Sequence, residues 1–273
     1  MAGEATIQSQ SARSRSRRQT RAATDRARGF CLTDRDLGLL RFAAAHRFVL
    51  ARQAQAWLGA SEVVAYRRLK GLVGADLMSY ERLFHHRPGC YRVTTAGLAV
   101  IESPLPRPLI DLRSYRHDTG LVWLWLHAWR GALGPYRQLL SERDMRSHDQ
   151  RPDSACGTFA IPLGGYARGG KRRVHFPDIV ICHEDGSRVA LELELTLKSR
   201  ARLEAIFAGY TAERRIARII YITDAAAVAA AVSEMVAMFG LDARVEVHYL
   251  GRASNCDPER WAWQMLRAGE TKP

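Results

Sequence analysis

Three carboxylates within one short stretch, residues 174–210, constrain the fold more than any other feature of the chain. Asp178 follows a proline at the start of an apolar run, and Glu192 and Glu194 alternate with leucines in a second run. The alternation predicts a half-buried strand at residues 189–197, with the leucines inward and the glutamates on the other face. An acidic, glycine-containing turn between the runs predicts a hairpin.

The register of this hairpin decides whether the three acids share a face, because a one-residue slip sends every side chain to the opposite face. A three-residue loop at 184–186 puts its glycine at the left-handed position of a bulged turn and sets Asp178 opposite Glu192. A two-residue turn instead sets Asp178 opposite Leu193 and separates the acids. The first register is favoured, since grouped carboxylates suit a cation site better than a solvated face.

Length and composition limit the class of protein. The chain has 273 residues, of which 47% are hydrophobic, enough for two soluble domains with buried cores. Its formal charge of +13 favours nucleic acid over acidic lipid as the partner. Five widely spaced cysteines form no zinc or disulfide pattern and indicate a reducing compartment. No apolar run reaches the ~18 residues of a spanning helix and no secretory signal is visible, so the default location is cytoplasmic.

Residues 1–29 are rich in arginine and poor in large apolar side chains, which predicts a disordered basic arm. Capping and periodicity signals then predict three helices, which open at Thr33, Leu50 and Ser61. Two strand-like segments joined by HHRPG follow. Three helices and a two-stranded ribbon predict a winged helix-turn-helix DNA-binding domain at residues 30–103.

This domain assigns a role to a set of basic and aromatic side chains. The third helix would enter the major groove, and the ribbon would reach the flanking backbone. The candidate contacts are Tyr66, Arg67, Arg68 and Lys70 on the helix, and Arg82, His85, His86 and Arg87 on the ribbon. Double-stranded DNA is therefore the expected partner, with a second copy of the chain as a further one. The alternative interpretation is a solvated helix face and a loop tip.

Prolines in residues 104–114 predict a stiff linker before a second domain at residues 115–252. Periodicity there predicts the order helix, strand, strand, strand, helix, strand, helix, strand. The fold class is therefore α/β, of the α+β kind. Residues 253–273 are expected to form a packed tail without chemistry.

The second domain opens on a helix that is apolar on most faces, and its tryptophans are expected in the core rather than as base-stacking platforms. For His117 and Asp118 at its start, a structural role is favoured over a place near the acids. Residues 137–145 have the pattern of a strand. The segment GGYARGGKRR has the composition of a basic loop, either tracking a DNA backbone or simply mobile.

The order of elements, together with Pro177-Asp178 and Glu192-x-Glu194, resembles the αβββαβ core of PD-(D/E)XK nucleases. The resemblance implies that Asp178 and Glu192 bind a divalent metal, Mg²⁺, which activates water and stabilises the transition state of phosphodiester cleavage. Glu194 stands where that family usually has lysine. Lys198, near the start of the next helix, would supply the missing positive charge. These four residues are the candidate catalytic set.

Residues 32–250 also resemble the replication-relaxation family of plasmids and other mobile elements. The matching stretches are LTDRDLGLLRFAAAHRFVL, YRVTTAG, RHD, SERDMR and the FPDIVI and LELELTLKS strands. The resemblance implies a DNA-binding protein acting in replication, relaxation or mobilisation. Two hypotheses stay open: a metal-dependent endonuclease, or a catalytically inactive DNA-binding regulator whose nuclease-like domain serves dimerisation or partner docking.

Overall fold

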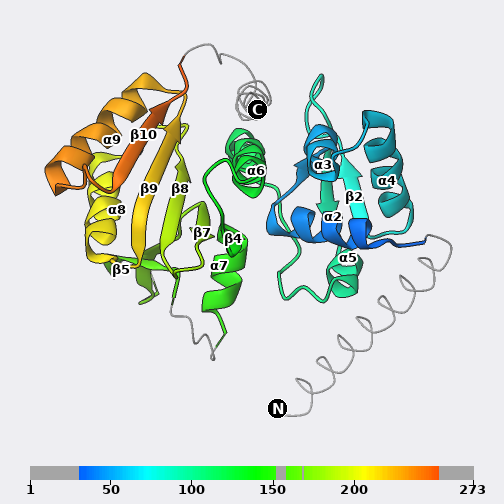
Figure 1. Ribbon diagram of the computed structural model, residues 1–273, viewed down its shortest axis with the longest axis horizontal. Helices are drawn as coiled ribbons and strands as arrows, with labels where there is room; N and C mark the ends of the chain where they lie inside the picture. Colours follow the sequence, from blue (N-terminus) through cyan, green and yellow to red (C-terminus); the bar gives the residue numbers. More distant parts are fainter. Residues whose placement is uncertain (1–30, 152–157, 168, 252–273) are drawn as a thin grey trace. The chain divides into compact units, whose positions relative to one another are not determined.

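The computed structural model describes residues 31–151, 158–167 and 169–251 (Figure 1). The chain divides into two compact units, Met1–Ile110 and Asp111–Pro273, and the division falls inside the segment predicted as a linker. Both units mix helices and strands, as expected for an α+β protein. The predicted basic arm and the predicted C-terminal tail lie outside the described residues. Within the described ranges, no helix combines the length and apolar character needed to cross a membrane.

The three helices of the first unit begin where their capping residues predict. α2 spans Asp34–Ala45 and follows Thr33, whose side chain takes part in a reciprocal capping box. α3 spans Ala51–Leu58 and ends at a glycine in the left-handed conformation. α4 spans Glu62–Gly74 and follows Ser61, whose hydroxyl accepts a hydrogen bond from the first turn. These starts confirm the sequence prediction.

A small antiparallel sheet completes the first unit. β2 (Met78–Glu81) and β3 (Cys90–Val93) form the predicted ribbon, and β1 (Val49–Leu50), which the sequence did not predict, pairs with the other edge of β3. A short helix, α5 (Thr95–Val100), then packs against α2. Its Gly97 lies close to the residue that precedes β2, because a Cβ there would lie 2.2 Å from the Leu77 backbone carbonyl oxygen.

The second unit is built on a five-stranded sheet with the order β10-β9-β8-β7-β4. β4, β7 and β8 are antiparallel neighbours, whereas β8, β9 and β10 run parallel and are connected by helices. The strands are β4 (Gln138–Ser141), β7 (Ile179–Cys182), β8 (Arg188–Leu193), β9 (Ile216–Thr223) and β10 (Val245–Tyr249). The connecting helices are α8 (Arg200–Ala212) and α9 (Ala226–Phe239).

Helices cover both faces of this sheet, with α8 and α9 on one side and α6 on the other (Figure 1). A 3-10 turn, η1 (Leu112–Ser114), leads into α6 (Tyr115–Trp129). Trp123 and Trp125 are buried, as expected of core residues, whereas Trp129 is 38% exposed and stacks on Trp125. The predicted element order is confirmed for these helices and strands.

Two segments differ from the sequence prediction. Residues 137–145 do not form one strand, because Ser141 caps a new helix, α7 (Glu142–Asp149). The two ends of the glycine-rich passage are strands and not parts of a loop: they belong to a separate two-stranded sheet made of β5 (Ile161–Tyr166) and β6 (Arg172–His175). Hydrophobic alternation missed it, because its glycines interrupt the period-two pattern.

β8 also differs from the expected half-buried strand. Every residue from Val189 to Leu195 is buried, including Glu192 and Glu194, because α6 covers one face of the sheet and α8 the other. Leu197, which was expected to face inward, is 59% exposed, since the strand ends before it. The two glutamates therefore lie in the protein interior and not on a solvated face.

Candidate active site

The β7–β8 hairpin has the register predicted from its turn. Ile179 pairs with Leu191 and Cys182 with Arg188, and the loop between the strands holds three residues. Gly186 has a φ of +82°, as the bulged turn requires. One step beyond the last pair, the same register sets Asp178 opposite Glu192. The alternative two-residue turn is therefore excluded.

Asp178 directly precedes β7, at the point where backbone pairing with β8 stops. Its Oδ2 accepts a hydrogen bond from the Leu193 backbone N–H at 2.8 Å and lies 3.3 Å from His117 Nε2. Burial opposes ionisation, but His117 and the Leu193 N–H outweigh it, so the pKa of Asp178 is lowered. The carboxylate is thus held as an anion.

His117, on the first turn of α6, forms the other half of this pair. Burial disfavours its charged form, but the Asp178 carboxylate and a hydrogen bond from the His117 ring to Asp118 raise its pKa to about 10. The preceding residue, Arg116, forms an ion pair with Asp224 at the end of β9. The RHD motif therefore fixes the start of α6 to the sheet end that carries Asp178. The sequence favoured a structural role for His117 over a place near the acids, but the structure places its ring beside Asp178.

Glu192 is held by two side chains from different elements. Its Oε1 lies 2.6 Å from Nε2 of His175, at the end of β6, and accepts a hydrogen bond from the Tyr210 hydroxyl of α8. Burial and the adjacent Glu192 raise the pKa of Tyr210 well above its ordinary value, so its hydroxyl stays a donor. Sequence reasoning missed both partners. In the sequence, Tyr210 has only the spacing of a core residue of its helix, and the one signal for His175 is its place just before Pro177-Asp178.

Glu194 and Lys198 form an ion pair directly after β8. The Lys198 side chain is about a third exposed, whereas that of Glu194 is nearly buried. Burial lowers the pKa of Lys198, and the carboxylates of Glu192 and Asp178 offset that effect only in part. The ammonium group thus lies within the field of all three acids. We call this group of Asp178, Glu192, Glu194 and Lys198 the carboxylate end of the sheet.

The oxygen atoms at the carboxylate end fit a hard divalent cation. Asp178 Oδ1 and Glu192 Oε2 accept no hydrogen bond from any residue that the structure describes. Mg²⁺ is commonly held by one or two carboxylates together with water or substrate phosphate. No three His, Cys, Asp or Glu side chains within the described ranges are arranged to hold a metal ion. The fit is therefore to a two-carboxylate site completed by water or phosphate.

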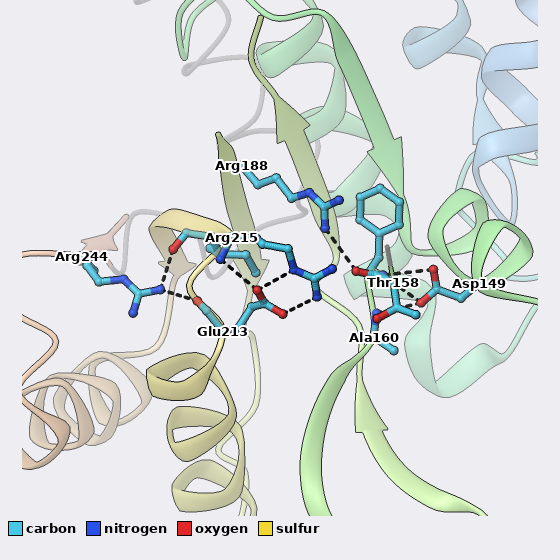
Figure 2. Close-up of polar contacts among 9 residues, drawn as sticks. Asp149, Thr158, Ala160, Arg188, Glu213, Arg215 and Arg244 are labelled. Atoms are coloured by element: carbon cyan, nitrogen blue, oxygen red, sulfur yellow. Dashed lines mark hydrogen bonds and ion pairs between the residues drawn. The ribbon is translucent and has the colours of Figure 1, made fainter. Parts of the chain in front are cut away.

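The opposite end of the same sheet carries a second set of charged residues, which is shown in Figure 2. Arg215 forms a bidentate pair with Glu213, and Arg244 donates to the carbonyl oxygens of Glu213 and Ile216. Arg188 donates to the Thr158 carbonyl oxygen. We call this group of Arg188, Arg215 and Arg244, with Glu213 and Asp149, the arginine end.

The carboxylates of the arginine end are fully used within the chain. Asp149 accepts hydrogen bonds from the backbone N–H groups of Phe159 and Ala160, and both of its oxygens take part (Figure 2). Both oxygens of Glu213 bind Arg215. This end joins loops to one another and leaves no carboxylate oxygen for a ligand.

The candidate DNA contacts of the first unit differ in availability. Tyr66, Arg67 and Lys70 are exposed on α4, but Arg68 forms an ion pair with the buried Asp36 of α2. Val64 of the same helix is 40% exposed, because Ala65 occupies the inward position. On the ribbon and the loop beyond it, the predicted contacts Arg82, His85, His86 and Arg87 are all exposed.

Comparison of the chain with models of known families, with curated proteins and with solved structures gives no match. The function is therefore argued from the residues of the site. The most informative of these is the pair Asp178 and Glu192, which adjacent strands bring together and which two histidines and a tyrosine hold in place.

Proposed function

We propose that the chain is a DNA-binding protein whose second unit is a Mg²⁺-dependent endonuclease of the PD-(D/E)XK type. The observation that carries the proposal is the pairing of Asp178 with Glu192, each with one carboxylate oxygen that no described residue uses. An antiparallel β4–β7–β8 set followed by α8 and the parallel β9 supports the αβββαβ assignment.

The residues of the carboxylate end have separable roles in this reaction. Asp178 and Glu192 would hold the metal, which activates water and neutralises charge on the phosphate. His117 and the Leu193 N–H orient Asp178, while His175 and Tyr210 orient Glu192. Buried donors of this kind fix ligand geometry before substrate arrives.

Lys198 replaces the family's lysine in this proposal. Its ammonium group, tied to Glu194, lies where positive charge would face the scissile phosphate. The lowered pKa of Lys198 favours release of a proton to the leaving group or to water. Glu194, which stands where that family usually has lysine, would then position Lys198 and not act on the substrate itself.

Plasmid cleavage tests the proposal. Supercoiled plasmid is incubated with the protein in Mg²⁺ or Mn²⁺, beside Asp178→Ala and Glu192→Ala, and the products are separated on agarose. Wild-type protein is expected to yield nicked or linear DNA, and both variants to lose roughly 10³-fold in rate, as the loss of several kcal/mol of metal-dependent stabilisation implies.

The matched control is Asp185→Ala, which removes a carboxylate from the exposed hairpin loop, seven residues from the site, and should cleave as wild type does. If the wild type shifts DNA in a gel but leaves plasmid intact in both metals, the endonuclease proposal fails.

The winged helix-turn-helix assignment of the first unit is part of the same proposal. It is supported by α2, α3 and α4 followed by the β2–β3 ribbon, and by the exposed cations of α4. Arg67→Ala with Lys70→Ala should weaken duplex binding and lower the slope of log affinity against log salt by about 1 per lost phosphate contact. Unchanged affinity would point to a protein-interaction role.

The choice of residues in this test follows from the Arg68–Asp36 pair. Substituting Arg68 would also leave the buried Asp36 without its cation, and a loss of binding could then reflect loss of folding. Burial opposes the charged form of Asp36, but hydrogen bonds from Arg68 and Thr33 lower its pKa. Arg67 and Lys70 lack such a constraint.

A second function is favoured by one observation, the glutamate at the lysine position. In a regulator of plasmid replication, relaxation or mobilisation, the second unit would serve dimerisation or partner docking and the Glu194–Lys198 pair would be structural. Duplex binding without cleavage, together with a dimeric mass in sedimentation, would support this function over the first.

A further inference from the structure

The β5–β6 ribbon is distorted at one point of its longer strand. Ile161 pairs with His175 and Pro162 with Val174, but Tyr166 pairs with Arg172, so β5 holds two extra residues between these positions. Gly164 and Gly165, with φ of +71° and +67°, occupy the irregularity. A bulge re-aims the side chains that follow it. Here it brings Tyr166 directly across from Arg172.

The two faces of the ribbon differ sharply. Ile161 and Leu163 are buried against α8, where a Cβ on Gly209 would come within 2.7 Å of Ile161. Residues paired across an antiparallel ribbon share a face, so Tyr166, Arg172 and Val174 lie together on the other one. Tyr166 is 68% exposed and Val174 is also exposed. The outward face therefore presents an aromatic ring beside a guanidinium group.

The described residues do not neutralise the positive charge of the ribbon. Lys171, Arg172 and Arg173 are exposed, and no acidic side chain within the described ranges pairs with them. Other exposed arginines of this unit do have acidic partners: Arg200 binds Glu204 and Glu234, and Arg218 binds Glu246. Three consecutive unpaired cations repel one another, so the ribbon gains most from an anionic partner.

The ribbon is also joined to the carboxylate end. β6 ends at His175, whose ring binds Glu192, and Asp178 follows three residues later. Asp178 lies five positions after Arg173, a span of at most about 18 Å along an extended chain. A strand held by the ribbon would thus lie within a few nucleotides of the carboxylates.

We infer that the outward face of the β5–β6 ribbon binds single-stranded DNA, with Tyr166 stacking on an unpaired base and Lys171 and Arg172 binding the flanking phosphates. A ring beside cations is the arrangement that single strands use, since every base offers a face to stack on. Duplex DNA offers phosphates but no free base faces. The inference rests on the proposed function for the nucleic-acid class of the ligand, but not on cleavage.

The test uses the full chain carrying Arg67→Ala and Lys70→Ala, so that the first unit contributes little. Fluorescence anisotropy with a labelled mixed-sequence oligonucleotide, single-stranded or annealed, is measured without metal at several salt concentrations. In this background, Tyr166→Ala should weaken single-strand binding by about 5- to 100-fold, as loss of one base stack implies, and Tyr166→Phe should not. Duplex binding should change less than twofold in both variants.

Charge is tested by a matched pair of triple variants. Alanine at Lys171, Arg172 and Arg173 should lower the salt slope for single strands by about 1.4, since Lys171 and Arg172 each lose one phosphate contact that contributes roughly 0.7. The control variant removes the same charge at exposed positions off the ribbon, Arg113, Arg137 and Arg214, and should leave the slope unchanged.

Three results would overturn the inference. Tyr166→Ala could lose as much affinity for duplex as for single strands, or the control triple variant could lower the salt slope as much as the ribbon triple variant does. Tyr166→Phe could also bind single strands as weakly as Tyr166→Ala. Its failure is distinguishable from that of the proposed function. If wild-type protein cleaves plasmid but the Tyr166 variants bind single strands as tightly as it does, the inference is wrong and the proposed function stands. If Tyr166→Ala loses single-strand binding but wild-type protein leaves plasmid intact, the endonuclease proposal is wrong and the inference stands.

Discussion

The two ends of the five-stranded sheet use charge in opposite ways. At the arginine end, both oxygens of Asp149 and of Glu213 bind donors from the chain itself (Figure 2). At the carboxylate end, Asp178 and Glu192 each use one oxygen, although both are more than four-fifths buried. The second arrangement therefore leaves one oxygen of each carboxylate for water or a ligand, whereas the first leaves none.

The largest expected contrast is in folding stability. Asp149→Ala leaves the N–H groups of Phe159 and Ala160 without their charged acceptor, and should lower the free energy of unfolding by about 2–3 kcal/mol. Glu192→Gln keeps an acceptor for Tyr210 and His175 and removes one of the grouped charges, so its change should stay within about 1 kcal/mol. Urea denaturation of both variants measures the difference, and equal losses would erase the contrast between the ends.

A smaller effect is expected at the hydroxyl that holds Glu192. Tyr210→Phe removes one buried donor while His175 remains, so the free energy of unfolding should fall by about 1 kcal/mol. If Glu192 binds metal, cleavage should fall 10- to 100-fold, as for other groups that orient a ligand. Tyr136→Phe, which removes a hydroxyl that donates to the Trp129 carbonyl oxygen, is the control and should cleave normally.

The smallest effect is a difference in pH dependence. Because the folded-state pKa of His117 is about 10 against an ordinary 6.5, its contribution to stability is complete below pH 6.5 and is lost as pH rises toward 10. Urea denaturation in EDTA should show this alkaline decline in the wild type and a flatter profile in His117→Gln.

The arginine end supplies the control for that profile. The hydrogen bond from Arg215 lowers the pKa of Glu213, so the stability from Glu213 is present above its ordinary 4.5 and is lost on acidification. Glu213→Gln should therefore leave the alkaline decline unchanged. The same slope in wild type and His117→Gln would show that the His117–Asp178 pair does not set the decline.

Local signals in the sequence were sufficient for the hairpin register and for most element starts. A glycine that needs positive φ fixed the turn at 184–186, and side-chain caps fixed the helices that follow Thr33 and Ser61. These features depend on residues close in sequence, which is why they could be read without the fold.

Features that depend on distant residues were missed. The burial of Glu192 arises because α6 and α8 cover opposite faces of β8, which no alternation pattern in β8 records. His175 and Tyr210 join that carboxylate from other elements. The β5–β6 ribbon escaped notice because its pairing crosses two glycines with left-handed φ, where the hydrophobic period is broken.

The hydrogen bond from the Leu193 amide to Asp178 has a consequence for observing the site. A side-chain oxygen accepts this proton, at the point where backbone pairing between β7 and β8 has stopped. Any ligand that draws the carboxylate away must release the amide, whereas a ligand on Oδ1 alone leaves it in place. The exchange rate of this single proton with deuterium therefore reports which oxygen of Asp178 is occupied, without need of substrate or turnover.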